Sequence, residues 1–244
     1  MFSVHFFSQK RPAISLGMFN AIFALWIAIS LNVSFYQHLV SLTPAMGIHA
    51  ALFIGSSALI IFSLYLLIFQ LIHWQLNAKL CMAMWIILGG LSAYFVNSLG
   101  VMIDADQIQN VLQTDTHEAF DLLTFRLIFW ILAIVAAPLI LIYVLRIRSE
   151  PIASILLKKL ITSLSCLLFI AGSLFIYYVD YAAIFRENRE LKSMISPQNV
   201  IASSISYYQK QAPKQNLPFI HYAKDAHIIQ RVSLSTSPKL MVLV

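Results

Sequence analysis

Residues 48–72 read IHAALFIGSSALIIFSLYLLIFQLI, twenty-five positions without Asp, Glu, Lys, Arg or Pro. A bilayer core about 30 Å thick is crossed by about 20 apolar helical residues. This stretch therefore predicts a helix that spans a membrane. Further apolar stretches of suitable length raise the expected number of crossings to five, and they are residues 14–35, 80–96, 126–145 and 160–179.

The composition agrees with lipid as the main solvent. Hydrophobic residues make up 60% of the 244 residues and charged residues 11%, with a mean hydropathy of +0.81. A soluble domain is about one quarter charged, and a chain of this size could not hide so much apolar surface in one core. Of the 16 Lys and Arg residues, eight lie beyond Asp180 and the other eight are scattered through the first 180 residues, so the net charge of +6 is no sign of nucleic-acid binding, which needs basic residues clustered on a folded surface. We predict an all-α membrane protein.

The orientation follows from the basic residues in the short loops. The ends of the spans that face one side carry only Arg126. The opposite ends carry seven basic residues, which are Lys10, Arg11, Lys79, Arg146, Arg148, Lys158 and Lys159. Because cytoplasmic loops are rich in Lys and Arg, the N-terminus is expected in the cytoplasm and the C-terminal segment on the far side.

The loop between the third and fourth predicted spans is acidic. From residue 104 to 123 it has no Gly or Pro and predicts an amphipathic helix. Asn110, Thr114 and Glu118 are spaced four residues apart, so they form one polar column on that helix. Amide, hydroxyl and carboxylate groups suit a phosphate ester joined to an ammonium headgroup. The alternative is a helix that lies on the membrane with its polar face in water.

The segment after residue 180 has a different character. Ser196 and Pro197 are a helix-start signal, and a helix is expected from residue 197 to about 210. A linker follows, and residues 239–244 resemble a buried strand that needs a sheet from elsewhere. The expected units are residues 1–180 as the five-span domain, 181–238 as bridging helix and linker, and 239–244 as the first strand of an absent α/β domain.

Few motifs in the chain could carry chemistry. There is no nucleophile elbow, zinc-protease motif or phosphate loop, and we predict no metal ligands in this chain. Cys81 and Cys166 lie in apolar runs and are expected to be free thiols. The absence of charged residues deep in the predicted spans argues against a proton-coupled transporter. Gly89 and Gly90 predict the close approach of a neighbouring helix.

Three stretches in this order resemble the N-terminal membrane domain of the lipid A phosphoethanolamine transferases, a family that includes the polymyxin (colistin) resistance transferases. The first is YFVNSLGVMID at residues 94–104, continued by QIQNVLQTD at 107–115 and EAFDLL at 118–123. The second is VDYAAIFR at residues 179–186, and the third is ISPQN at 195–199. The resemblance covers nearly the whole chain, five-span topology included.

The resemblance implies transfer of phosphoethanolamine from phosphatidylethanolamine to lipid A on the periplasmic face of a bacterial inner membrane. It also implies a zinc-dependent catalytic domain whose nucleophile and zinc ligands lie beyond Val244, so this chain alone is expected to be inactive. Asn110, Thr114 and Glu118 match family positions near the phosphatidylethanolamine site, which favours the headgroup interpretation of the loop. The alternative is a non-enzymatic five-span accessory or sensor protein that binds lipid headgroups or a partner through this loop.

Overall fold

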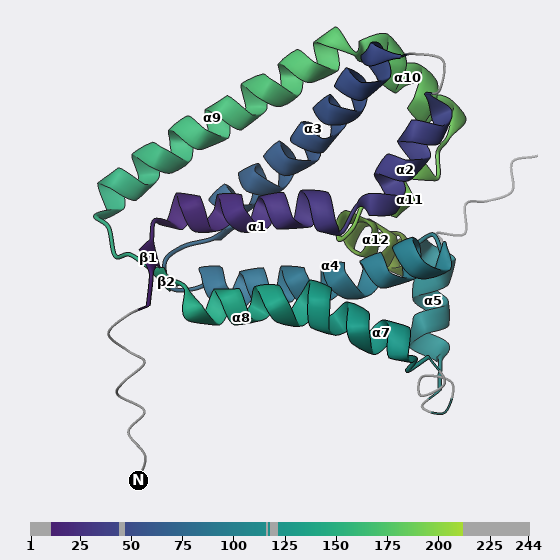
Figure 1. Ribbon diagram of the computed structural model, residues 1–244, viewed down its shortest axis with the longest axis horizontal. Helices are drawn as coiled ribbons and strands as arrows, with labels where there is room; N and C mark the ends of the chain where they lie inside the picture. The colour runs from purple at the N-terminus through teal and green to yellow at the C-terminus, as the bar shows by residue number, and fades with distance from the viewer. Residues whose placement is uncertain (1–10, 44–46, 116, 118–121, 212–244) are drawn as a thin grey trace, which may run out of the picture. The chain divides into compact units, whose positions relative to one another are not determined.

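The computed structural model describes residues 11–43, 47–115, 117 and 122–211 (Figure 1). Apart from two short strands, the described elements are helices. In chain order they are β1 (Ala13–Ile14), α1 (Leu16–Ser30), α2 (Val33–Leu42), α3 (Ile48–Ile72), α4 (Ala78–Leu99), α5 (Ala105–Gln113), α7 (Phe125–Trp130), the π-helix η3 (Ile131–Ala136), α8 (Ala137–Val144), β2 (Arg146–Ile147), α9 (Ile152–Ile176), α10 (Tyr178–Glu187), α11 (Leu191–Met194) and α12 (Gln198–Gln211).

Four spans are long, apolar helical segments: α3, α4, α7–η3–α8 and α9. The fifth consists of α1 and α2, which meet at a bend of 53°. The all-α, five-span architecture is therefore confirmed, but one continuous first span over residues 14–35 was wrong. The side-chain amide of Asn32 donates to the carbonyl oxygen of Ile27 at 2.9 Å. This contact competes with the regular backbone hydrogen bonds, and α1 ends just before it.

The fourth span holds a proline and a local change of helix type. Its bounds, Phe125–Val144, agree with the predicted 126–145 to within one residue. The backbone N–H of Ala137 donates to the carbonyl oxygen of Leu132, five residues earlier, in the π-helix η3. Pro138 follows at once, and a proline ring would crowd the carbonyl four residues before it in a regular helix. The wider π turn leaves room for the ring.

The last span, α9, starts at Ile152 instead of residue 160, so it takes Lys158 and Lys159 into the helix. The Lys159 side chain is buried, donates to the carbonyl oxygen of His73 at 2.6 Å and lies over the Trp74 ring at 4.1 Å. The prediction that charged residues stay out of the spans therefore needs this correction. A lysine has a long apolar stem, and near a helix end its ammonium can still reach polar partners.

Close packing joins the spans within the described unit. Helix α3 packs on α1 and α9, and α4 packs on η3 and α8. Gly89 and Gly90 permit this approach, as predicted: a Cβ on Gly89 would lie 2.7 Å from Leu31 Cδ1, and one on Gly90 would clash with the Val135 side chain. The indole nitrogen of Trp130 donates to the Gly90 carbonyl oxygen at 2.9 Å. Both glycines are thus needed for contact with other segments.

The two ends of the spans differ in what covers them. We call one the strand end, because β1 and β2 pair there in parallel, with Ala13 opposite Arg146 and Ile14 opposite Ile147. We call the other the helix-capped end, formed by α2, α5, α10, α11 and α12, which gather away from β1 and β2 (Figure 1). Pairing between the start of the first span and the end of the fourth was not predicted, because two-residue strands leave no pattern in the sequence.

The prediction of one continuous helix over residues 104–123 was wrong, because the helix that starts there is shorter. Helix α5 ends at Gln113, and Thr114 is extended, with ψ 127°. Thr, Asp and Thr follow one another at residues 114–116, and such side chains compete with helical backbone hydrogen bonds. The second predicted helix agrees closely with α12 at Gln198–Gln211. The predicted strand at residues 239–244 lies outside the described part of the chain.

Candidate lipid-headgroup site

The predicted polar column lies on α5 at the helix-capped end, but it is not one continuous helical column. Asn110 is exposed on the last turn of α5, and Thr114 caps the helix and is half-buried. The Thr114 hydroxyl donates to the carbonyl oxygen of Asn110 at 2.8 Å. Glu118 lies outside the described residues. The structure thus brings Asn110 and Thr114 together and leaves the position of Glu118 as a prediction.

Helix α5 is fixed at its start and along its side. Asp104 is its N-cap, and Oδ1 accepts from the backbone N–H groups of Asp106 at 3.1 Å and Gln107 at 2.8 Å. Helix α12 packs alongside α5, and its buried Ser203 hydroxyl donates to the carbonyl oxygen of Ile103 at 2.8 Å. Asn110 is therefore carried by a helix whose start is anchored to α12.

An exposed ion pair adds a second link between these helices. Lys210 Nζ on α12 lies 2.9 Å from Asp106 Oδ1 on α5. Hydrogen bonding to this carboxylate and its charge raise the pKa of Lys210. Both side chains are well exposed, so water and salt screen the pair and it stabilises the contact only weakly.

The segment ISPQN at residues 195–199 joins α11 to α12 and docks on the bend of the first span. Asn32 Oδ1 accepts from the Ser196 backbone N–H at 2.9 Å, and Asn32 Nδ2 donates to the Ser196 carbonyl oxygen at 3.2 Å. The backbone N–H of Gln198 donates to the Tyr65 hydroxyl at 3.3 Å. Asn32 and Ser196 are fully buried, so these bonds satisfy groups that water cannot reach.

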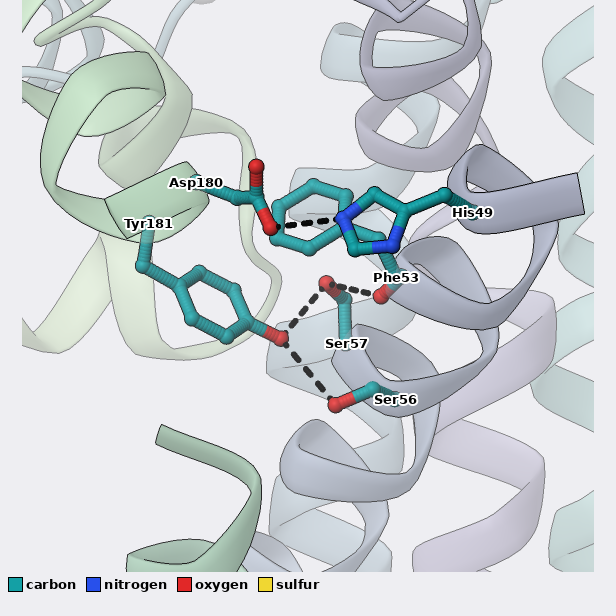
Figure 2. Close-up of polar contacts among 6 residues, drawn as sticks. All are labelled: His49, Phe53, Ser56, Ser57, Asp180 and Tyr181. Carbon is teal, nitrogen blue, oxygen red and sulfur yellow. Dashed lines mark hydrogen bonds and ion pairs between the residues drawn. The ribbon is translucent and has the colours of Figure 1, made fainter. Parts of the chain in front are cut away.

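The segment VDYAAIFR at residues 179–186 forms most of α10 and contacts the start of α3 (Figure 2). Asp180 Oδ2 lies 2.9 Å from His49 Nε2. The Tyr181 hydroxyl lies 2.9 Å from Ser57 Oγ and 3.4 Å from Ser56 Oγ. Burial raises the pKa of Tyr181, so its hydroxyl stays protonated at neutral pH. These contacts hold α10 against the second span.

A cavity of about 530 Å³ lies beside the Tyr181 contacts. Its walls come mainly from apolar side chains of α3, α9 and α10, with polar groups from Ser57, Tyr181 and Gln198. Sites for small ligands are typically apolar with a few placed polar groups, and this volume lies in their usual range. The cavity therefore suits the apolar part of an amphipathic ligand near the helix-capped end.

Sequence reasoning did not single out His49, Asp180 or Tyr181 as a contact set. His49 and Asp180 are 131 positions apart, and neither lies in a local motif that requires the other. The polar residues inside apolar spans were a usable signal. Polar side chains in apolar spans commonly form hydrogen bonds between helices, and Asn20, Ser56 and Ser57 each contact a side chain of another helix.

Potential metal ligands are scattered in the described part of the chain. No group of three or more His, Cys, Asp or Glu side chains there could hold a metal ion. His221 and His227 lie outside the described residues. Cys81 and Cys166 are free thiols, as predicted, with Cys166 buried and Cys81 half-buried. The described residues therefore do not fit a zinc site.

A sequence model of the family described as "Phosphoethanolamine transferase EptA/EptB" matches residues 61–212, which include most of the spans and all of α5, α10 and α12. The chain belongs to the EptA/EptB phosphoethanolamine transferase family. The match includes both segments that dock on the first two spans, residues 179–186 and 195–199, whereas their partners Asn32, His49 and Ser57 precede the matched residues.

Individual relatives agree with the family. The chain is 28% identical over 222 residues to the phosphoethanolamine transferase EptA of Escherichia coli K12, covering 89% of this chain and 40% of that protein. It is 26% identical over 242 residues to the phosphatidylethanolamine transferase Mcr-2 of Escherichia coli, covering 97% of this chain and 44% of the relative. The chain thus spans less than half the length of these relatives.

A solved structure supports the same fold. The integral membrane protein lipooligosaccharide phosphoethanolamine transferase A (EptA) from Neisseria meningitidis matches with a TM-score of 0.77 at 23% sequence identity. The match covers 85% of this chain and 38% of that chain. The multi-span membrane fold of EptA is therefore shared by the present chain.

Proposed function

We propose that this chain is the membrane domain of a transferase that moves phosphoethanolamine from phosphatidylethanolamine to lipid A. In this proposal it anchors the catalytic domain in the bacterial inner membrane, with the N-terminus cytoplasmic and the helix-capped end periplasmic. The observation that carries the proposal is the family match over residues 61–212, which includes α5, α10, α11 and α12 of the helix-capped end. The parent enzyme would bind zinc through residues of its catalytic domain.

The loop after α4 would contribute to the lipid substrate site. Glu118 would pair with the ammonium of phosphatidylethanolamine, and Asn110 and Thr114 would bond to phosphate or glycerol oxygens. The side-chain contact of Thr114 with the Asn110 carbonyl supports this, because it sets the two residues side by side where α5 ends. The cavity of about 530 Å³ beside Tyr181 would accept an acyl chain of a lipid.

A chimera tests the proposal. This chain would be joined to the part of Escherichia coli EptA that it does not match and expressed in a strain without phosphoethanolamine transferases. We expect lipid A to gain phosphoethanolamine, measured by mass spectrometry of extracted lipid A. A chimera that is inserted and zinc-loaded but leaves lipid A unmodified, while intact EptA modifies it in the same strain, would overturn the proposal.

Glu118→Gln in the active chimera tests the headgroup role. Loss of the carboxylate charge removes the proposed ammonium partner, so transfer should fall about tenfold, the effect of one charge-assisted pair. Gln109→Ala is the matched control, because Gln109 is an exposed residue of α5 outside the proposed site. If the Glu118→Gln variant and the control transfer phosphoethanolamine equally at equal protein level, the headgroup role is wrong. The loop would then be interpreted as a segment on the membrane with its polar face in water.

A further inference from the structure

A second cavity at the helix-capped end has a different chemistry from the one beside Tyr181. It measures about 330 Å³ and lies between α2, α4 and α7. Polar side chains from all three helices line it: Ser34, Gln37, Asn97, Ser98 and Arg126. The walls thus combine hydroxyl and amide groups with one guanidinium. The family segments at residues 179–186 and 195–199 contribute none of its lining residues.

Hydrogen bonds fix two walls of this cavity. The backbone N–H of Ser34 donates to Asn97 Oδ1 at 2.9 Å, and Asn97 Nδ2 donates to the carbonyl oxygen of Leu31 at 3.3 Å. Asn97 therefore ties the start of α2 to the end of α4. Trp130 anchors the third wall through its hydrogen bond to the Gly90 carbonyl oxygen. The cavity is held by contacts that do not use its charged residue.

Arg126 is the one charged side chain among the described residues that line the cavity. Its guanidinium has five N–H donors and no acceptor, and it stays protonated. Within the described ranges it makes no hydrogen bond or ion pair, and the same holds for the side chains of Gln37 and Ser98. Unused donors from three helices therefore point to a ligand with several acceptor oxygens and a negative charge.

Apolar groups stand next to this cation. Phe129 lines the cavity three residues after Arg126 and leaves 74% of its surface exposed, and Val33 on α2 is 41% exposed. Residues three apart on a helix share a face. A ligand at Arg126 would therefore also contact apolar surface at the end of a membrane span. This combination suits a lipid headgroup with its chains along α7.

We infer that Arg126, Gln37 and Ser98 bind the phosphate of an anionic lipid headgroup between α2, α4 and α7. An arginine can pair with a phosphate through two parallel N–H···O bonds, and the amide and hydroxyl can bond its remaining oxygens. Since the described lining residues include no carboxylate, the ammonium of phosphatidylethanolamine has no partner among them. The site therefore favours lipids with net negative charge and does not depend on the proposed transfer reaction.

Lipid binding by the purified chain tests this site directly. The chain in detergent would be titrated with phosphatidylglycerol, lipid A and phosphatidylethanolamine, and bound lipid would be counted by native mass spectrometry. Arg126→Gln should lower the affinity for both anionic lipids about tenfold, which is the loss expected for one charge-assisted pair. The affinity for phosphatidylethanolamine should change less than twofold. Arg126→Lys, which keeps the charge, should recover part of the affinity.

Arg148→Gln is the matched control, because Arg148 is an exposed arginine at the strand end. It should leave all three affinities unchanged. If Arg126→Gln lowers the affinity for lipid A alone, the bound phosphate belongs to lipid A. If the affinity for phosphatidylglycerol falls equally, the site binds anionic lipids in general. The inference would be overturned if Arg126→Gln bound the anionic lipids with affinities within twofold of those of the unsubstituted chain. It would also be overturned if the affinity for phosphatidylethanolamine fell as much as the affinity for the anionic lipids.

Discussion

The strand end and the helix-capped end are held by different kinds of contact. At the strand end, backbone pairing of β1 with β2 joins two spans, and the buried Asn20, His73 and Lys159 bond across helices. At the helix-capped end, single side chains such as Asn32 hold short helices in place. A cavity of about 20 Å³ lies beside α1 and α9 at the strand end, cavities of about 530 and 330 Å³ lie at the helix-capped end, and one of about 570 Å³ lies between α1 and α8. The helix-capped end thus offers two cavities large enough to hold part of a lipid.

Asn32→Leu should destabilise the helix-capped end more than any other substitution considered below. It removes the partner of both backbone groups of Ser196, and a buried group left without a partner costs roughly 1–3 kcal/mol. We expect a loss of about 4 kcal/mol in the free energy of unfolding in mild detergent. Hydrogen exchange should speed up in α11 and α12 and stay unchanged at β1 and β2.

Asn188→Leu is the control for this substitution. The Asn188 amide donates to the Ile184 carbonyl oxygen at 3.0 Å, a contact within the end of α10 and not between segments. Its loss should cost about 1 kcal/mol. Equal stability of the Asn32→Leu and Asn188→Leu variants would contradict the role given to Asn32.

The strand end should respond to acid through His73. Its Nδ1 lies 2.9 Å from Asn20 Oδ1, while its Nε2 is buried without a partner among the described residues. Burial, and then the charge of Lys159, lower the pKa of His73 to about 4 from its model-peptide value of 6.5. Between these values the unfolded chain binds a proton that the folded chain does not. Folding stability should therefore fall as pH drops from about 6.5 to about 4, by about 2–3 kcal/mol.

Unfolding in detergent at a series of pH values measures this dependence. His73→Gln should remove most of the slope between pH 6.5 and 4, because glutamine does not titrate in this range. An identical slope in the His73→Gln variant would assign the acid response to other groups.

Gly89→Ala tests the close approach at the helix-capped end. The new Cβ would meet Leu31 Cδ1 at 2.7 Å and Pro197 Cβ at 3.2 Å. Overpacking of this kind costs about 1–3 kcal/mol. Gly172→Ala on α9 is the control, since its Cβ would meet nothing within 4 Å, and it should leave stability unchanged or slightly raised. A neutral Gly89→Ala in the same unfolding assay would show that Leu31 and Pro197 can shift without cost.

Lys210→Met should have the smallest effect. The Lys210–Asp106 pair is exposed and screened, and the buried Ser203 contact already links α12 to α5. We expect no measurable change in the unfolding midpoint at physiological salt. A clear drop would mean that charge, rather than the buried contacts, holds α5 in place.

The spans were predictable because their apolar character is a property of each segment alone. Helix α3 has the predicted bounds, and the fourth span differs by one residue at each end. The docking of residues 195–199 on the bend was not predictable, because it rests on hydrogen bonds between Asn32 and Ser196, which are 164 positions apart. For the same reason the sequence showed that Asn20 and Ser57 needed partners but did not identify them.

The candidate site was predicted less completely than the spans. Helical spacing selected Asn110 and Thr114, and the structure sets them in contact, yet Thr114 ends the helix on which that spacing depended. The Thr114 hydroxyl donates to the Asn110 carbonyl oxygen, and this local bond between side chain and backbone competes with continuation of the helix. The cavities formed by three helices each could not be read from any one segment.

The pairing of β1 with β2 has a consequence for the order of events during synthesis. Ala13 is synthesised early, whereas its partner Arg146 is synthesised 133 residues later. At 5–20 residues per second this delay is on the order of 10 s. The first helix must therefore wait in the bilayer, its strand residues unpaired, until the fourth helix arrives. Final assembly of the bundle is consequently a late event in biogenesis, sensitive to any pause in translation between the two segments.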